Sequence, residues 1–332
     1  GTVQYFGVST FTTGIFRTFY GYGDTAAAAQ LAASLLAFVI LLVMLERYSR
    51  RRARYHSAAE SRARADLIPL TGSKAFLALM ICLVPLGFGF VIPAGQLLWW
   101  AVFEAEPLGW EFVNLAWNSF CLAFLAALVA VTLAILLAYA QRARPIKPVR
   151  GVLAMSGFGY ALPGTIIAIG VLIPLAWIDH RIIALFEGWG WDSPGLILSG
   201  SLIALLFAYT VRFLAVALGS VQAGLEKIKP SLDYAGRSMG HSPLAILRKI
   251  HVPLMRSSVL TAVLIVFVDV LKELPATLIL RPFNFNTMAV RAYELASDER
   301  LVDAAPASIM IVLVGLIPVL LLHTSIARRR PQ

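Results

Sequence analysis

Four charged residues lie within or at the ends of long apolar runs of this sequence, where an unpaired charge is costly. Asp269, Lys272 and Glu273 stand at positions i, i+3 and i+4, a spacing that places them on one face of a helix. We expect Lys272 to pair with Asp269, and Arg212 either to pair with a carboxylate such as Asp269 or to extend toward water. Pro275 follows at once and is expected to end or kink the helix. Two interpretations are open: the charges line a polar path or its gate, or they form a structural ion pair between helices.

The sequence carries no pattern typical of catalysis or of metal binding. Its two cysteines and five histidines show no metal-ligand spacing with one another or with carboxylates. The phosphate-binding pattern GxxxxGK[ST] is absent, because Gly72, Ser73 and Lys74 lack the upstream glycine. We therefore expect no enzymatic activity, no metal ligands and no cofactor bound by this chain.

The elements that position these charges are expected to be membrane helices. The chain is 59% hydrophobic and 14% charged over 332 residues, with a mean hydropathy of +0.79. Apolar runs of about 20 residues indicate transmembrane helices, and these runs are too continuous for the strands of a barrel. The sequence predicts an all-α membrane protein with about seven transmembrane helices, near 25–45, 75–98, 113–140, 151–177, 196–219, 257–280 and 304–325.

The net charge of +10 is distributed by loop. Loops 46–74, 141–150 and 220–256 and the tail 326–332 hold 21 of the 28 lysines and arginines, whereas the alternate loops hold five. Basic loops stay on the cytoplasmic side of a membrane. This pattern predicts an N-terminus outside and a C-terminus inside, suggests contact with anionic lipid, and explains the charge without nucleic-acid binding.

The polar segment Pro230–Pro253 lies between two apolar runs and has the signals of two short helices. We expect Ser231 to cap the first helix, with Asp233 in its first turn, where a negative charge is favourable. Gly240 suits the position that ends a helix, and it could allow both a sharp turn and a close approach.

In the second helix Ser242 is the expected cap and Pro243 the first residue. Leu244, Leu247, Ile250 and Leu254 follow at helical spacing. The segment is either a docking surface for a cytosolic partner or a connector lying on lipid headgroups. A connector could be far shorter, which favours docking.

These residues resemble the coupling loop of importers of the ATP-binding-cassette class, which has the form EAA, three residues, Gly, nine residues, Ile-x-Leu-Pro. The residues at the aligned positions, which keep the family's spacing, are Tyr234, Ala235, Gly236, Gly240, Ile250 and Pro253. Three residues depart from the pattern: Tyr234 replaces the glutamate, Gly236 the second alanine and Val252 the leucine. Asp233, one position earlier, could supply the acidic group.

Two further stretches, residues 272–301 and 159–172, are similar to stretches of ferric-iron permeases of this importer class. Thiamine, sulfate and polyamine permeases share the architecture, and they stay open as alternatives. The resemblance implies a type I importer permease in the bacterial inner membrane, a periplasmic binding protein that delivers substrate, and two copies of a separate ATPase that uses ATP and docks on the loop.

An internal repeat suggests that a further permease half precedes this one. A shift of 274 residues aligns 11–20 with 285–294, with Phe11 matching Phe285 and Arg17 matching Arg291. Residues 1–50 are then expected to be the tail of a preceding half with its last transmembrane helix. The other predicted parts are a basic cytosolic linker (51–74), a six-helix permease domain (75–327) that contains the coupling loop 220–256, and a basic cytosolic tail (328–332).

Two other classes remain possible. An ion-coupled secondary transporter would also have repeats and intramembrane charges, but it would have no need of a capped cytosolic loop with the importer spacing. A membrane enzyme is the weaker alternative, because the sequence shows no pairing of a nucleophile with a base.

Overall fold

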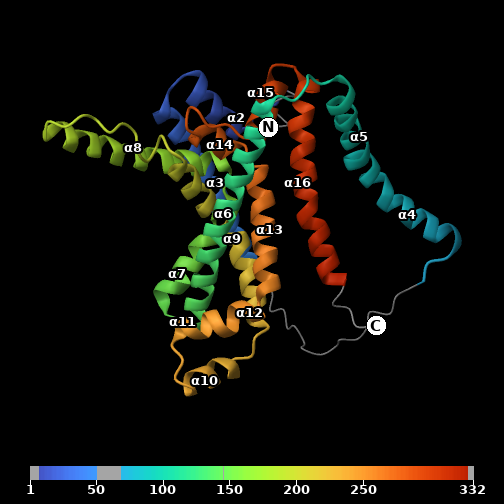
Figure 1. Ribbon diagram of the computed structural model, residues 1–332, viewed down its shortest axis with the longest axis vertical. Helices are drawn as coiled ribbons and strands as arrows, with labels where there is room; N and C mark the ends of the chain where they lie inside the picture. Colours follow the sequence, from blue (N-terminus) through green and yellow to red (C-terminus); the bar gives the residue numbers. More distant parts are fainter. Residues whose placement is uncertain (1–6, 51–68, 145, 328–332) are drawn as a thin grey trace.

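The computed structural model describes residues 7–50, 69–144 and 146–327, and within these ranges every regular element is helical. The prediction of an all-α protein is confirmed. Most of the predicted linker 51–74 and the tail 328–332 lie outside the described residues. Figure 1 shows a tall bundle, a tilted helical rod on one side and a helix that projects sideways on the other.

The bundle consists of three long helices that pack against one another: α6 (Trp110–Ala143), α9 (Leu202–Glu226) and α13 (Arg256–Leu271). Small side chains form much of their contact surface. In α6 the buried positions include alanines at three- and four-residue spacing: Ala123, Ala126, Ala127, Ala130, Ala134 and Ala138. Such residues let helix backbones approach closely, as is common between membrane helices.

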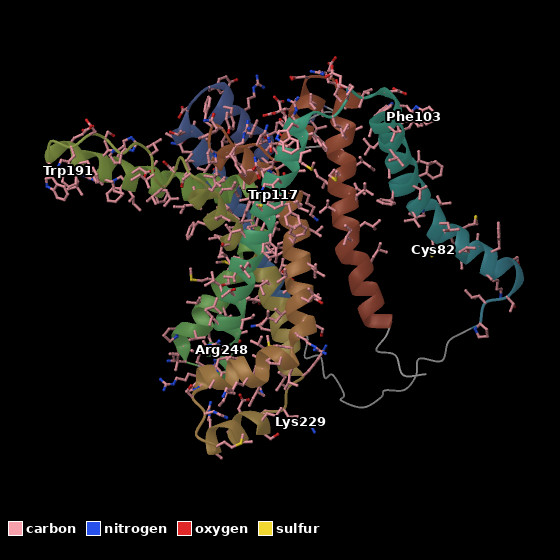
Figure 2. All side chains as sticks on the ribbon, in the orientation of Figure 1. Cys82, Phe103, Trp117, Trp191, Lys229 and Arg248 are labelled. Atoms are coloured by element: carbon pink, nitrogen blue, oxygen red, sulfur yellow. The ribbon has the colours of Figure 1, made fainter. Side chains whose placement is uncertain are left out.

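The rod is a continuous apolar helix with two π-helical turns. It consists of α4 (Gly72–Leu86), η2 (Gly87–Val91), α5 (Ile92–Trp99) and η3 (Trp100–Glu104). None of these four elements contains a buried residue. At its upper end the rod contacts α16 (Leu301–Ala327), which also packs on α13 and on α15 (Met288–Ser297). Phe103 lies near its upper end in Figure 2, and Cys82 lies further down its length.

The upper end of the bundle is covered by short helices from both ends of the chain. These are α2 (Phe11–Phe16), η1 (Arg17–Gly21), α14 (Pro275–Leu280) and α15. The Tyr20 hydroxyl donates to the carbonyl of Leu278, and the Phe16 and Tyr293 rings meet edge to face at 6.3 Å. α3 (Thr25–Arg50) follows and contacts α8 (Gly164–Gly188). The interpretation of residues 1–50 as part of a preceding half stays a prediction.

The predicted span 151–177 is wrong as a single helix. The structure divides it into α7 (Lys147–Ser156), the short η4 (Gly159–Ala161) and α8 (Gly164–Gly188). Pro163, which has no backbone N–H, occupies the N-cap position of α8, so the chain restarts its helix there. α8 then projects sideways from the bundle, with Trp191 near its far tip (Figures 1 and 2).

The predicted span 257–280 is also interrupted. α13 ends at Leu271 and α14 begins at Pro275, so Pro275 does end the run of helix as expected. Among the described residues five helices are long and apolar enough to cross a membrane, or six if the bent pair around Met255 counts as one span. α16 adds a shorter apolar stretch, Leu301–Ile317, so the described helices agree with the prediction of about seven transmembrane helices.

Candidate functional site

The polar segment forms two helices at the lower end of the bundle, which we call the coupling elbow (residues 230–254; Figure 1). The first helix, α10 (Ser231–Ser238), ends as predicted at Gly240, whose φ is +78°. The Gly240 N–H donates to the carbonyl of Arg237 (2.9 Å) and the His241 N–H to that of Gly236 (3.1 Å). These two bonds form a Schellman motif, in which glycine adopts the left-handed conformation at little cost.

The second helix of the elbow also begins as predicted. The Ser242 hydroxyl accepts from the Ala245 N–H (3.3 Å), and Pro243 is the first residue of α11 (Pro243–Ile246). The helix continues through the π-helical turn η5 (Leu247–His251) into α12 (Val252–Leu254). It then bends by 79° into α13.

Two details of the elbow were not predicted from the sequence. Pro230, and not Ser231, occupies the N-cap position of α10, so no side chain caps that helix. The two helices of the elbow approach each other most closely at Gly236, a contact that the sequence did not predict; the close approach expected at Gly240 concerned a docking partner and stays a prediction. A Cβ at Gly236 would lie 3.0 Å from Ile246 Cγ1, whereas a Cβ at Gly240 would meet nothing within 4 Å. The short distance to Ile246 at this position is consistent with glycine in place of the second alanine of the importer pattern.

Asp233, in the first turn of α10, faces the bundle and not the solvent. Its Oδ2 accepts from Arg142 Nη2 (2.7 Å) and Nε (2.9 Å), and its Oδ1 lies 2.6 Å from His251 Nε2. His251 is completely buried, with its ring 5.3 Å from that of Tyr139. We call Arg142, Asp233 and His251 the Arg142 hub.

Arg142, in the last turn of α6, also binds the end of α9. Its Nη1 donates to the carbonyl of Leu225 (2.7 Å) and its Nη2 to that of Ile228 (2.8 Å). One guanidinium thus joins the ends of two bundle helices to the first turn of the elbow. Sequence reasoning identified neither Arg142 nor His251 as site residues. The one available signal was the displaced acid at Asp233, which needs a cation close by.

The hub also sets the ionisation of Asp233. Burial by itself raises the pKa of this carboxyl, but the hydrogen bonds and positive charges of Arg142 and His251 outweigh burial, so its pKa lies below the ordinary value. Asp233 is therefore an anion at neutral pH, and its charge is already engaged within the chain.

The outer surface of the elbow carries exposed apolar side chains. The exposed fractions are 39% for Leu232, 66% for Tyr234, 66% for Met239 and 58% for Leu244. We call these four residues the docking face. Leu244 and Leu254 were expected on the same helix face as Leu247 and Ile250, but both are exposed.

The remaining motif positions are divided between the two sides of the elbow. Ile246, Leu247 and His251 form the buried side of the second helix, whereas Ile250 is only half-buried. Ala235 and Pro253 are exposed. The π-helical turn shifts the helical register here, which explains the difference from the predicted face.

The intramembrane charges form two separate pairs. Lys272 Nζ lies 2.9 Å from Asp269 Oδ1, as predicted. Arg212 Nη1 lies 3.3 Å from Glu273 Oε1, so Arg212 pairs with Glu273 and not with Asp269. Glu273 lies just beyond the end of α13 at Leu271, so it is not part of the helix that carries Asp269.

The Arg212–Glu273 pair lies where two interrupted helices meet. Glu273 Oε1 accepts from the Ala276 N–H (3.2 Å) at the start of α14. On the other side, a Cβ on Gly164, the first residue of α8, would lie 2.3 Å from Arg212 Nη1 and 2.4 Å from Glu273 Oε1. A Cβ on Gly159 would lie 2.0 Å from the carbonyl oxygen of Val211. Gly159 is thus required by close contact with the backbone of α9, and the absence of a side chain at Gly164 leaves room for the Arg212–Glu273 pair.

A cavity of about 620 Å³ opens at the upper end, between the N-terminus of α6, α15 and the start of α16. Its lining includes Glu106, Glu111, Asn114, Asn118 and Arg291. Within the described part of the chain no group of three or more histidine, cysteine, aspartate or glutamate side chains has a geometry that could hold a metal ion.

Comparison with known proteins identifies relatives among permeases. Over 97% of its length the chain is 27% identical to the Fe(3+)-transport system permease protein FbpB 2 of Haemophilus influenzae, of which it covers 62%. Over 67% of its length it is 25% identical to the putative 2-aminoethylphosphonate transport system permease protein PhnV of Salmonella typhimurium, of which it covers 80%. The chain thus spans about three fifths of the first relative's length. No family model matches it.

Solved structures with the same fold come from a bacterial ABC transporter involved in the import of the acidic polysaccharide alginate. In one of them the match covers 77% of this chain and 96% of the solved chain, with a TM-score of 0.55 and 15% sequence identity. A second, of the alginate transporter in complex with an alginate pentasaccharide-bound periplasmic protein, covers 75% and 92%, with a TM-score of 0.54 and 14% identity. At this identity the likeness shows the fold alone. The chain is therefore an all-α, multi-pass membrane protein with the fold of an ABC importer permease, and its resemblance to that class is confirmed in sequence and in fold.

Proposed function

We propose that this chain is a transmembrane permease subunit of an ATP-binding-cassette importer, with no enzymatic activity of its own. A separate cytosolic ATPase, present in two copies, docks on the coupling elbow and supplies the energy of ATP hydrolysis. The lower end of the bundle then lies in the cytoplasm and the upper end faces the periplasm, where a binding protein delivers substrate.

The observation that carries this proposal is the construction of the elbow. Two short helices present four exposed apolar side chains to the outside, while the buried side is joined to the bundle by the Arg142 hub. Exposed apolar side chains clustered on a polar segment are typical of an interaction site. Lys229 and Arg248 lie on the same lower end in Figure 2, as expected for a cytoplasmic surface.

For the substrate we propose ferric iron, which the name of the relative from Haemophilus influenzae supports. The interrupted helices that meet at Arg212 and Glu273 are the proposed gate of the path, with Asp269 and Lys272 beside it. The phosphonate permeases among the relatives support 2-aminoethylphosphonate as a second candidate.

The docking proposal is tested with Met239→Asp in the intact transport system. The added charge lies on the docking face, so we expect the purified permease to lose its ATPase and the cells to lose uptake. Phe283→Asp is the matched control, because Phe283 is fully exposed on the loop that follows α14, far from the elbow. Retention of the ATPase by Met239→Asp, at the level of the control, would contradict docking on this face.

The substrate is tested by uptake of radioactive ferric citrate and, separately, of radioactive 2-aminoethylphosphonate. Inhibition of uptake by ATP depletion, with insensitivity to an ionophore that collapses the proton gradient, supports the importer class. The opposite pattern identifies an ion-coupled secondary transporter. Uptake of the phosphonate without uptake of ferric citrate would replace iron as the substrate.

A further inference from the structure

The end of α6 contacts both helices of the coupling elbow and the end of α9 at one point. We propose that Arg142 is the positioning residue through which movement of the elbow reaches the bundle, an inference that rests on the proposed function. Arg142 does not touch substrate or the docking partner in this scheme. It acts by holding three parts of the chain in one geometry.

All three nitrogens of the Arg142 guanidinium donate hydrogen bonds. Nε and Nη2 donate to the Asp233 carboxylate, while Nη1 and Nη2 donate to the carbonyls of Leu225 and Ile228. The planar fork of arginine can hold several acceptors at fixed angles, which the single ammonium group of lysine cannot. The side chain of Arg142 is 18% exposed and that of Asp233 13%, so water competes little for these bonds.

A second bridge runs parallel to the first one. Tyr139 lies one helical turn before Arg142, and its ring contacts the buried His251, which holds the other oxygen of Asp233. One face of α6 therefore contacts α10 through Asp233 and η5 through His251. Because both helices of the elbow are fixed to the same helix face, the elbow and α6 move as one body.

The bend that follows the elbow is also packed tightly against α9. A Cβ on Gly224 would lie 2.6 Å from Ser258 Cβ and 3.3 Å from Met255 Cβ, so the bend and the start of α13 are in close contact with α9. Met255 is the bend between the elbow and α13. The docking face is therefore connected to the bundle at two places, through Arg142 at Asp233 and through the bend at Met255. A displacement of the docking face should reach the bundle through both contacts.

The test is Arg142→Gln in the intact transport system, with three measurements: the ATPase retained by the purified complex, its rate of ATP hydrolysis, and uptake of radioactive ferric citrate. The docking face is untouched, so we expect the ATPase to be retained and to hydrolyse ATP. Uptake per ATP hydrolysed should fall about tenfold or more. Arg142→Lys should give an intermediate ratio, because lysine keeps the charge and loses the fork.

Arg144→Gln and Arg144→Lys are the matched controls. Arg144 lies two residues further along the chain and is exposed. Its replacement by glutamine removes the same positive charge as Arg142→Gln, and its replacement by lysine keeps the charge. Both controls should keep the ratio of the unaltered protein. An unchanged ratio in Arg142→Gln overturns the inference, and so does loss of the bound ATPase, because Arg142 would then support docking and not coupling.

A second measurement needs no transported substrate. Binding of a non-hydrolysable ATP analogue should change amide hydrogen exchange both in the elbow and at the end of α9, around Leu225–Ile228. In Arg142→Gln the change should remain in the elbow and be lost at α9. An equal change at α9 in this variant also overturns the inference. If the unaltered protein itself retains no ATPase, the proposed function fails, and that result is distinct from a failure of the hub.

Discussion

Replacing Gly164 by alanine should disturb the Arg212–Glu273 pair directly. The new Cβ would lie 2.3 Å from Arg212 Nη1 and 2.4 Å from Glu273 Oε1, and contacts this short are essentially never seen. Each group must move away by more than half an ångström, or α8 must shift. Overpacking of this kind costs about 2 kcal/mol, which lowers the folded-to-unfolded ratio by about 30-fold. We expect the thermal midpoint of the purified permease in detergent to fall by several degrees.

Gly170→Ala is the matched control, since it adds the same methyl group to the same helix. A Cβ there would meet nothing within 4 Å, and alanine is favoured over glycine within a helix by about 1 kcal/mol. This variant should melt at or slightly above the midpoint of the unaltered protein. If Gly164→Ala melts at the same temperature as Gly170→Ala, the close contact between α8 and the ion pair is not a constraint on the structure, and the reasoning is refuted.

Three further predictions follow from the elbow and the ion pair. Gly240→Ala should destabilise the elbow by about 1 kcal/mol because of the left-handed backbone, seen as faster hydrogen exchange there; Gly240→Trp should add little more, since the space is open. Glu273→Gln should cost about 3 kcal/mol by leaving Arg212 without its partner, and an unchanged melting temperature would contradict that pairing. The stabilisation from the lowered pKa of Asp233 should be present above the ordinary aspartate range and lost only as pH falls through the lowered value. Asp233→Asn should abolish this acid step in a melting-temperature series.

The parts of the site that the sequence predicted depend on local chemistry. The roles of three predicted residues concern only their near neighbours along the chain. Gly240 forms a left-handed turn, the Ser242 hydroxyl caps a helix, and Pro243 is the restrained first residue of that helix. The pairing of Lys272 with Asp269 is equally local. Such signals can be read from a single sequence, because their partners are adjacent along the chain.

The parts that the sequence did not predict depend on distant contacts. Arg142 and Asp233 are 91 residues apart, and no spacing rule connects them. Arg212 meets Glu273 because the helix is interrupted after Leu271, whereas a continuous helix was expected there. Gly236 was predicted as part of the loop, but its contact with Ile246 of the opposing helix was not. Local propensity predicts where a helix starts and ends, but it does not predict which faces come together.

The rod Gly72–Glu104 is 33 residues long and buries none of its apolar window inside the chain. At 1.5 Å per residue it is about 50 Å long, whereas the hydrocarbon core of a bilayer is about 30 Å thick. A helix longer than the bilayer accommodates the mismatch by tilting, and the rod is strongly tilted relative to α16 in Figure 1. The rod contacts α16 at its upper end and buries no residue of its own, so such an inclination would let its excess length fit within a bilayer. In a thicker bilayer the rod should stand more upright while the helices of the bundle keep their mutual packing.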